Sequence, residues 1–465
     1  MAKSGDVVVV GGGISGLACC VQLHKLGVPV TLLEASECAG GLIHTVETEG
    51  FLFESGPQSF QATETLLGLI REMRIEGELC AADPHAPRYV LRHGRLQKIP
   101  MSPQAILSTS LLGIGARWRV VSEALRKTTP PSEEESIAAF VRRKFGHEIL
   151  EYLVSPFVSG VYAGDPEKLS LRAAFPTLHE WEHEYGSVLR GAMKSRGGDR
   201  ASQTAPSLCS FRRGMSTLPQ AMARQLGDRV QTKTCVESIE FANNQGGFRI
   251  SSICDNSRVV LNARAVVMAA PAHISAPLLK AVAPDVAQKL SGIAYASLAV
   301  FAAGYYKKQV SGPLDGFGVL IPRRENHRTL GIVWNTSLFP GRAPDGQMVL
   351  TSFIGGATDL EITARPKQEI AAIVQKDHER ILGITGPPIR FALWTHQKAL
   401  PQYNLGHGHV VQAIRNAEQS VAGLYFAGNY LEGPSIGKCV ERGFYVAEKV
   451  KAYLGGTPGD IAMGT

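Results

Sequence analysis

Three glycines near the N-terminus have the spacing of a phosphate-binding turn. Gly11, Gly13 and Gly16 follow four consecutive valines, a run typical of a strand buried on both faces. In such a turn the first glycine allows a tight bend, the second lets the backbone approach a pyrophosphate, and the third lets the next helix pack close to the strand. The N–H groups at the start of that helix favour an anion, because the helix dipole is positive there. The spacing predicts a dinucleotide-binding turn.

A carboxylate follows where a ribose site requires one. A second apolar run begins at Val30 and ends at Glu34, about twenty residues beyond the glycines. A carboxylate in this place accepts hydrogen bonds from ribose hydroxyls and disfavours a 2′-phosphate. The alternative is a glycine-rich turn that binds no ligand. It does not explain why a strand, the three glycines, a helix, a second strand and an acid follow one another in this order. The segment alone leaves NAD and FAD open.

Length and composition are those of a multidomain globular protein. The chain has 465 residues, of which 44% are hydrophobic and 19% charged. Its net charge of +7 suits an acidic small molecule or an anionic membrane surface, and no basic cluster is dense enough to predict nucleic-acid binding. The eight cysteines have no metal-ligand spacing, so no metal site is expected.

The N-terminal segment also has features of a signal peptide. The uncharged stretch 7–23 follows Lys3, but its three glycines would break a hydrophobic signal helix. We therefore expect a bacterial-type cytoplasmic protein with neither a signal nor a transit peptide, located in the cytoplasm or peripherally on the inner membrane face.

The last part of the chain predicts that the dinucleotide is FAD. A buried strand ends at Ala427–Gly428, where larger side chains would obstruct a ribityl chain, and a helix follows from Ser435. The N–H groups at the start of this helix would stabilise the negative charge of a reduced flavin. A simple NAD-binding fold needs no such closing element. The C-terminal segment therefore favours FAD over NAD.

Further segments resemble the flavin amine oxidase superfamily. A glycine pair at 40–41 precedes a strand that ends in Gly56–Pro57, and in that superfamily these segments line the ADP and flavin parts of FAD. Most members carry arginine or lysine after the glycine pair, where this chain has Leu42, so the backbone is expected to make one of the polar contacts. The stretch PFVSGVYAGDPEKLS at 156–170 narrows the resemblance to the protoporphyrinogen oxidase family, especially its bacterial and plastid branches.

The resemblance implies a set of residues that hold the cofactor. The expected FAD-binding residues are Gly11, Gly12, Gly13, Ile14, Ser15, Gly16, Glu34, Ala35, Gly41, Leu42, Gly56, Pro57, Gln58, Ser59, Val236, Trp394, Gly428, Asn429, Pro434, Ser435 and Ile436. Among them, the position of Val236 is expected to give backbone contacts to the adenine.

The resemblance also implies a tetrapyrrole site. Arg88 is expected to pair with a propionate, as a bidentate guanidinium would, and Gln58 to line the pocket. Arg88 and Gly164 are the residues expected to act in the reaction. Gly164, or its neighbour Ala163, lies in the turn whose backbone carbonyl is expected to face the substrate near the flavin.

Three apolar residues complete that expected site. Leu320 and Val333 are expected to clamp one pyrrole ring, and Phe353 to stack on a neighbouring ring. Val333 replaces a more familiar leucine, which would loosen the clamp. Without the resemblance, these three residues would be taken as ordinary sheet core.

The implied activity is the oxidation of protoporphyrinogen IX to protoporphyrin IX by O2. Six electrons are removed and H2O2 is formed, as a step of haem biosynthesis, with ferrochelatase as a downstream partner. The alternative is an enzyme of the same fold that oxidises coproporphyrinogen III to coproporphyrin III. Its substrate has four carboxylates, for which Arg92, Arg95 or the pair Arg323–Arg324 would supply extra cations. An amine- or carotene-oxidising relative and an FAD-binding scaffold without turnover are further alternatives. The sequence leaves monomer and homodimer open.

The expected fold class combines α/β and α+β structure in three domains. A Rossmann-like FAD-binding domain is assigned to 1–82, 208–272 and 402–465, and a substrate domain with a mixed antiparallel sheet to 83–100 and 273–401. A helical domain is assigned to 101–207.

The start of the helical domain permits two interpretations. Apolar residues alternate with arginines in 101–127, which is typical of helices that lie in a membrane interface. A core helix pair with a cationic outer face explains the pattern about as well. The helical domain is therefore expected to face either a membrane or solvent.

Overall fold

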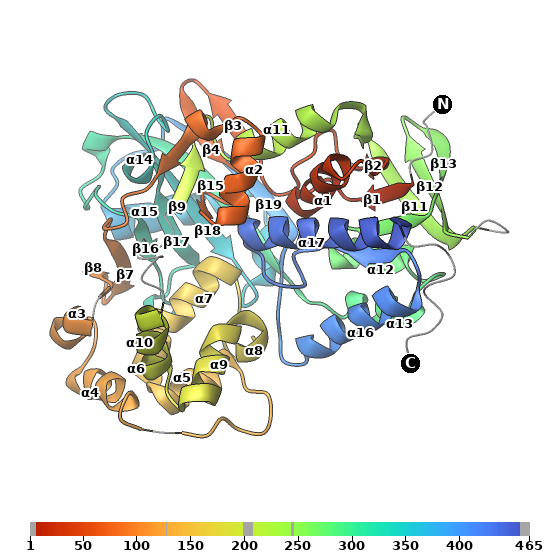
Figure 1. Ribbon diagram of the computed structural model, residues 1–465. Helices are drawn as coiled ribbons and strands as arrows, with labels where there is room; N and C mark the ends of the chain where they lie inside the picture. The colour runs from red at the N-terminus through yellow and green to blue at the C-terminus, as the bar shows by residue number, and fades with distance from the viewer. Residues whose placement is uncertain (1–5, 102, 127, 199–207, 243–245, 456–465) are drawn as a thin grey trace.

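The computed structural model describes residues 6–101, 103–126, 128–198, 208–242 and 246–455. Two large sheets and a layer of helices make up the molecule (Figure 1). Each sheet is assembled from segments that lie far apart in the sequence, so the chain crosses repeatedly between the parts of the molecule.

The first sheet is parallel and has five strands in the order β10–β2–β1–β14–β20. Its strands are Val230–Gln231, Val30–Leu33, Val7–Val10, Ala265–Met268 and Leu424–Phe426. The strands β1, β2 and β14 are buried along their whole length, as a parallel sheet covered on both faces requires. All five strands lie within the segments that we predicted to form the FAD-binding domain.

Different elements cover the two faces of the parallel sheet. Val7 and Val9 pack with α1, α2, α11 and α17, whereas Val8 and Val10 pack with α12, α13, α16 and the antiparallel sheet β11–β12–β13. The bounds of the helices are Ile14–Lys25 (α1), Glu64–Glu72 (α2), Thr217–Leu226 (α11), Ala272–Leu278 (α12), Pro284–Ser291 (α13), His407–Ser420 (α16) and Ile436–Gly455 (α17). The three strands are Thr234–Phe241, Phe248–Cys254 and Ser257–Ala263. The helices α12 and α13 therefore pack on the parallel sheet, although residues 273–291 were assigned from the sequence to the substrate domain.

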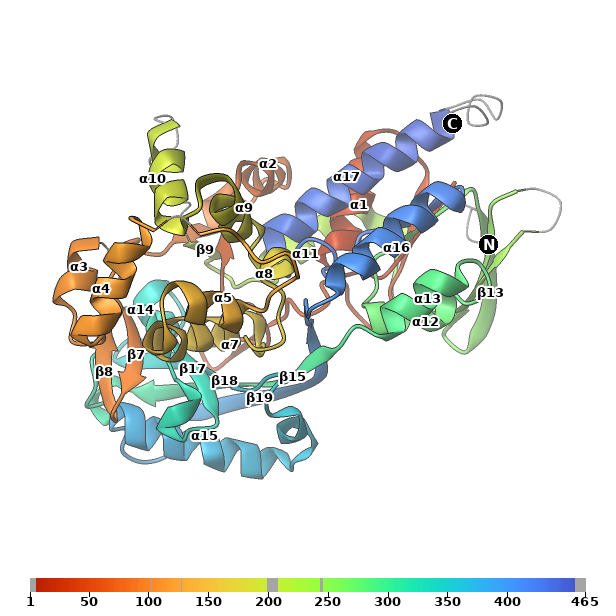
Figure 2. The same cartoon turned by 90° about the horizontal axis from the view of Figure 1, so that it is seen from below.

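The second sheet is mixed and has seven strands in the order β19–β15–β18–β17–β16–β7–β8. These strands are Arg390–Pro401, Tyr295–Tyr306, Gln347–Gly355, Thr329–Trp334, Gly318–Leu320, Arg88–Arg92 and Arg95–Lys98. Only the β16–β7 pair is parallel. One face packs on α15 (Lys367–Leu382), and Figure 2 shows α5 and α7 on the other side of the sheet.

Short strands connect the two large sheets. They are β3 (Thr45–Thr48), β4 (Phe51–Glu54), β5 (Phe60–Gln61), β6 (Leu79–Ala81) and β9 (Leu208–Phe211). Phe51 and Phe53 of β4 pack against Ala302 and Val349 of the mixed sheet. This contact brings the segment after β4 to the mixed sheet.

The helical layer lies between residues 103 and 198. Its helices are α3 (Pro103–Ser108), α4 (Ile114–Glu123), α5 (Ile137–Lys144), α6 (His147–Ile149), α7 (Ser155–Tyr162), α8 (Leu171–Ala174), α9 (Pro176–Tyr185) and α10 (Val188–Gly198), with a π-helical turn at Leu150–Val154. Within the described ranges, no helix combines the length and the apolar character needed to cross a bilayer.

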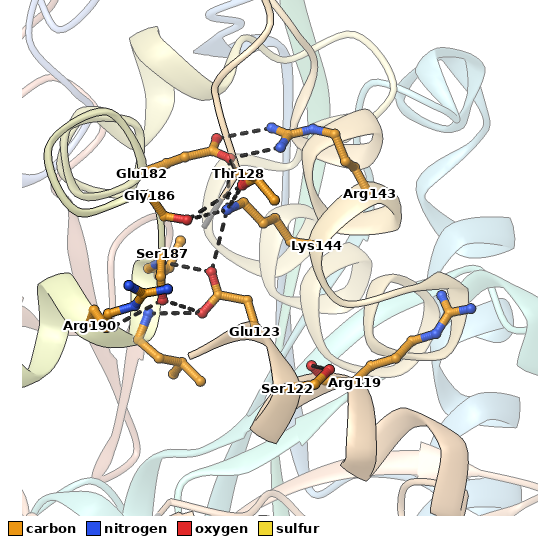
Figure 3. Close-up of polar contacts among 12 residues, drawn as sticks. Arg119, Ser122, Glu123, Thr128, Arg143, Lys144, Glu182, Gly186, Ser187 and Arg190 are labelled. Carbon is orange, nitrogen blue, oxygen red and sulfur yellow. Dashed lines mark hydrogen bonds and ion pairs between the residues drawn. The ribbon is translucent and has the colours of Figure 1, made fainter. Parts of the chain in front are cut away.

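A buried ion network holds four helices of this layer together (Figure 3). Lys144 of α5 lies 2.8 Å from Glu182 of α9 and 3.5 Å from Glu123 of α4, and these three side chains are at most 2% exposed. Glu123 also accepts hydrogen bonds from backbone N–H groups at the start of α10. Burial alone would raise the pKa of Glu182, but hydrogen bonds from Arg143, Lys144 and Thr128 outweigh it and lower that pKa to about 2.

Candidate active site

The glycine turn after β1 has the shape that its sequence predicts. Gly11 has a φ of +110°, in the left-handed region that favours glycine. A side chain at Gly16 would place its Cβ 2.0 Å from the Gly11 carbonyl oxygen, so α1 packs closely on the turn. At Gly13, by contrast, an added Cβ would meet no heavy atom within 4 Å. The N-terminal turn of α1, which includes Ile14 and buried Ser15, therefore begins beside open space.

Glu34 lies against this turn. Its Oε2 accepts a hydrogen bond of 2.7 Å from the Gly12 N–H, and its Oε1 accepts one of 2.8 Å from the Ser36 N–H. The Thr234 N–H, at the start of β11, donates to the Glu34 carbonyl oxygen at 2.9 Å. The structure thus brings Gly12, Glu34 and Ala35 to the carboxyl edge of β1 and β2, and Val236 follows on the adjoining strand β11.

The second glycine pair lies directly on the first turn. The Gly40 N–H donates to the Gly12 carbonyl oxygen at 2.8 Å, and a Cβ at Gly41 would stand 3.2 Å from the Cα of Gly13. Gly56 in turn packs on Leu42, where an added Cβ would lie 2.1 Å from the Leu42 carbonyl oxygen. Residues 40–42 and Gly56 therefore form one layer against the glycine turn, and Pro57 and Ser59 follow Gly56 in the chain.

The C-terminal signature reaches the same region. Gly428 follows β20, and a Cβ there would overlap the ring of Tyr430 at 2.0 Å. Pro434 and Ser435 precede α17, and the Ser435 Oγ accepts a hydrogen bond from the Lys438 N–H. The helices α17 and α1 lie side by side (Figure 1), with the Cβ position of Gly443 only 2.7 Å from the Ser15 carbonyl oxygen. Residues more than 400 positions apart thus meet at the glycine turn.

One face of the mixed sheet carries four of the five predicted substrate residues, all except Gln58. Directly paired strand residues share a face, and successive pairs cross the sheet. A first row runs Trp394, Val300, Phe353, Gly331 and Leu320.

A second row on the same face runs through Val333, Gly318 and Arg88. Arg88, Leu320, Val333, Phe353 and Trp394 therefore all face away from α15, toward the side of the sheet on which α7 packs. The Cβ position of Gly160 in α7 lies 2.7 Å from Leu320 Cδ2.

The turn at Gly164 ends α7 beside this face. Ala163 has a φ of +48° and packs in one cluster with Val300, Phe353 and Trp394. Its carbonyl oxygen accepts a hydrogen bond of 2.7 Å from the Ala357 N–H, which leaves one lone pair. Gly164 is buried, and a Cβ there would lie 2.6 Å from Leu169 Cδ1, so a larger residue would require the Leu169 side chain to shift.

Arg88 has the environment of an anion-binding residue. Its guanidinium lies over the Phe317 ring at 5.4 Å from the centroid, and its Nη1 is 3.8 Å from the Met101 sulfur. Neither of these contacts, made within the described part of the chain, is with a carboxylate. A half-buried guanidinium without an acid partner is suited to a ligand carboxylate.

Comparisons with known proteins show the family to which this chain belongs. The family model for flavin-containing amine oxidoreductases matches residues 14–451. The chain belongs to the flavin-containing amine oxidoreductase family.

Two relatives that match nearly the whole chain are named as porphyrinogen oxidases. A chloroplastic protoporphyrinogen oxidase of Nicotiana tabacum is 33% identical, over 97% of this chain and 86% of the relative. A coproporphyrinogen III oxidase of Bacillus subtilis is 29% identical, over 96% and 98%. The crystal structure of a proposed protoporphyrinogen oxidase from Exiguobacterium shares the fold with a TM-score of 0.82 at 24% identity, covering 97% and 99% of the two chains.

The cofactor of this flavin-containing amine oxidoreductase is FAD. The residues at the glycine turn fit its ADP part, because a helix N-terminus borders open space at Gly13 and a carboxylate lies at the end of β2. Residues 40–42, 56–59 and 428–436 adjoin this turn and would hold the remainder. Bound FAD supplies a two-electron oxidant that takes hydride from a substrate carbon.

Two side-chain hydrogen bonds at the site were not predicted from the sequence. Asn335, two residues beyond Val333, donates from Nδ2 to Gln58 Oε1 at 2.6 Å, and Gln58 Nε2 donates to the Gly56 carbonyl oxygen at 2.8 Å. This chain of bonds ties the mixed sheet to the cofactor segment. The sequence does not predict this pair, because the two amides are 277 residues apart. The one signal in the sequence is that Asn335 lies two residues beyond Val333, a predicted substrate residue.

Proposed function

We propose that this chain oxidises a porphyrinogen to a porphyrin, with protoporphyrinogen IX as its substrate. The observation that carries the proposal is the composition of one sheet face, where aliphatic, aromatic and cationic side chains stand in adjacent rows. A tetrapyrrole is a large apolar ring system with carboxylates at its edge. Such a ligand needs these three kinds of side chain.

Each side chain has a separate task in the proposed reaction. Arg88 pairs with a propionate and fixes the orientation of the ring system. Leu320 and Val333 pack on one pyrrole ring and Phe353 stacks on a neighbour, which excludes water and holds the reacting carbon still. The remaining lone pair of the Ala163 carbonyl oxygen accepts a hydrogen bond from a pyrrole N–H. Each two-electron step removes a hydride from a meso carbon and releases one pyrrole N–H proton to water. The electron-rich pyrroles activate the departing hydride, so no acid–base pair of the protein is required.

The four-carboxylate substrate coproporphyrinogen III is the second candidate, and the sequence similarity to a coproporphyrinogen III oxidase favours it. Three of the four candidate cations for this substrate are engaged elsewhere. Arg92 pairs with Glu148, Arg324 with Glu151, and Arg323 donates to the Gly355 carbonyl oxygen. Arg95 is exposed on β8. These contacts favour protoporphyrinogen IX.

The test is a parallel assay of the purified, FAD-loaded protein with both porphyrinogens. We expect fluorescent porphyrin to form faster from protoporphyrinogen IX than from coproporphyrinogen III. A faster reaction of coproporphyrinogen III would assign the second function. Absence of porphyrin from either substrate would reject both and leave an amine-type substrate or a non-catalytic scaffold.

We further propose that O2 is the electron acceptor and that the porphyrin passes to a ferrochelatase. The oxidase names of the relatives support O2, whose consumption and conversion to H2O2 an oxygen electrode and a peroxidase-coupled assay would measure. Size-exclusion chromatography with light scattering distinguishes the monomer from the homodimer.

The α4 surface supports peripheral contact with a membrane. Ile114, Trp118 and Val121 of α4, and Leu125 two residues beyond its end, recur at helical spacing and are between 38% and 82% exposed. The opposite side of the same helix is buried through Glu123 in the ion network (Figure 3). An exposed apolar stripe with arginines beside it fits the interface of an anionic bilayer.

Vesicle co-sedimentation tests this contact. We expect the protein to bind vesicles that contain phosphatidylglycerol and the variant Trp118→Asp/Leu125→Asp to remain in the supernatant with unchanged FAD content. Equal sedimentation of both proteins would contradict membrane contact through α4.

A further inference from the structure

The segment 402–407, which runs from the end of β19 to the first residue of α16, contacts two parts of the candidate site that lie far apart in the sequence. Three of its side chains are almost completely buried: Gln402 is 3% exposed, Tyr403 1% and His407 5%. None of them was predicted from the sequence as a site residue. Their polar groups point to the Gly164 turn at one end and to Asn429–Tyr430 at the other.

Gln402 holds the end of α7. Its Nε2 donates to the carbonyl oxygens of Tyr162 at 3.0 Å and of Leu400 at 3.2 Å. Because two carbonyls face this atom, it must be the amide nitrogen, and the orientation of the amide is fixed. The other amide atom, Oε1, lies 3.0 Å from the Cβ position of Gly164. Gln402 therefore satisfies a carbonyl at the helix end and packs against the turn that follows it.

Backbone bonds attach the same segment to the chain beyond the turn. The Ser170 N–H donates to the Tyr403 carbonyl oxygen at 2.8 Å, and the Leu405 N–H donates to the Lys168 carbonyl oxygen at 2.9 Å. The rings of Tyr162 and Tyr403 meet edge to face with centroids 6.1 Å apart. The Gly164 turn is thus held on both sides by residues 402–405.

The other end of the segment holds the loop after β20. The Tyr403 hydroxyl donates to the Asn429 carbonyl oxygen, and His407 Nε2 donates to the Tyr430 carbonyl oxygen at 2.8 Å. Burial lowers the pKa of His407, which keeps the ring neutral with its proton on the nitrogen that faces the carbonyl. The rings of Tyr403 and His407 also pack edge to face, with centroids 4.9 Å apart.

We propose that Gln402, Tyr403 and His407 are positioning residues that set the Gly164 turn relative to Asn429–Tyr430. The proposal rests on the proposed function, in which the turn faces the substrate and Asn429 borders the flavin. These three side chains then determine how far the reacting carbon stands from the flavin. Hydride transfer is sensitive to that separation, since a misplacement of about 1 Å can cost on the order of a hundredfold in rate.

A pair of tyrosine variants tests the flavin end. Tyr403→Phe removes only the hydroxyl that holds Asn429. The matched control is Tyr305→Phe, whose hydroxyl is equally buried and bonded to His378 at 3.0 Å on the α15 side of the mixed sheet. We expect both variants to lose similar thermal stability. Only Tyr403→Phe should shift the flavin absorption band, weaken FAD binding several-fold and lower kcat about tenfold with KM within about twofold.

A pair of glutamine variants tests the substrate end. Gln402→Met keeps the length of the side chain and loses the two bonds to carbonyls. Gln309→Met is the control, because Gln309 Nε2, at the end of the 3-10 helix Lys307–Gln309, also donates to two backbone carbonyls, those of the exposed residues Thr385 and Pro387. We expect Gln402→Met to lower kcat about tenfold with an unchanged flavin spectrum in the absence of substrate, and Gln309→Met to leave kcat unchanged.

The outcomes separate the two proposals. Indistinguishable effects of Tyr403→Phe and Tyr305→Phe on the flavin spectrum would overturn the positioning role, whatever the substrate is. A wild-type protein that oxidises neither porphyrinogen would reject the proposed function while the spectral test of Tyr403 still stands.

If Tyr403→Phe yields no folded protein, His407→Gln and His407→Leu replace it, because glutamine retains a donor toward Tyr430 and leucine does not. Equal kcat and equal spectra of these two variants would also overturn the proposal.

Discussion

Arg342, in the loop before β18, and Glu54, at the end of β4, form a buried ion pair. Arg342 Nη1 lies 3.4 Å from Glu54 Oε1, and the two side chains are 1% and 2% exposed. Arg342 Nη2 also donates to Ser210 Oγ at 2.6 Å and to the Phe211 carbonyl oxygen at 3.1 Å. Since Glu54 stands two residues before Gly56, this pair fixes the layer that packs against the glycine turn.

The pH dependence of stability should report on Glu54. Burial raises its pKa from the usual 4.5 to about 7. Hydrogen bonds from Thr45 and the Met215 N–H and the charge of Arg342 lower the pKa, but by less than burial raises it. The folded state therefore binds this proton more tightly than the unfolded state. The contribution of this proton to the free energy of unfolding is complete below pH 4.5 and is lost as the pH rises through 7. The loss amounts to a few kcal/mol, because one pK unit corresponds to about 1.4 kcal/mol.

Calorimetry between pH 5 and pH 8 measures this effect. We expect the melting temperature of the wild type to fall over this range and that of Glu54→Gln to be lower throughout but nearly constant. Glu49→Gln, at an exposed ion pair with Arg390, should keep the wild-type slope. A slope that persists in Glu54→Gln would assign the pH dependence to another group.

Two glycine variants should separate folding from cofactor binding. Gly16→Ala would force a Cβ to within 2.0 Å of a backbone oxygen, so we expect little folded protein. Gly13→Ala has no such clash and should leave the melting temperature of the FAD-free protein nearly unchanged. Its Cβ occupies the open space at the start of α1, however, so FAD affinity should fall at least about tenfold. Fluorescence titration with FAD measures this affinity. Wild-type affinity in Gly13→Ala would show that the cofactor lies elsewhere.

Arg88→Ala should weaken substrate binding and leave FAD in place. A hydrogen bond to a charged group contributes about 1.5–3 kcal/mol, so KM for protoporphyrinogen IX should rise about ten- to a hundredfold. The control is Arg95→Ala on the neighbouring strand β8, which is exposed and should keep the wild-type KM. Steady-state kinetics and the flavin absorbance give both quantities. Loss of FAD from Arg88→Ala would mean that Arg88 has a structural role instead.

Lys144→Met should strongly destabilise the helical layer. The variant leaves Glu123 and Glu182 buried without their central cation, which costs about 3–5 kcal/mol in comparable networks. Lys25→Met removes an exposed pair with Glu72 and should cost less than about 1 kcal/mol. Urea denaturation followed by circular dichroism compares the two. Equal stabilities would show that the buried network contributes little.

The sequence by itself determined the cofactor turn. The strand, the three glycines, the helix and Glu34 lie within residues 7–34, and each follows from the residue types beside it. A buried strand, a left-handed glycine and a helix start depend on neighbouring residues, so local patterns predict them. The family resemblance added the residues of the sheet face, Arg88, Leu320, Val333 and Phe353, but not their spatial relation.

Only the tertiary structure decided which distant side chains meet. The register of the mixed sheet places Arg88 and Val333 on either side of Gly318, and an amide pair joins Asn335 to Gln58. The ion pair between Arg342 and Glu54 and the bonds made by residues 402–407 likewise join segments far apart in the chain. Local periodicity carries no information about these contacts, because strand register and the partners of buried polar groups are fixed by packing of the whole fold.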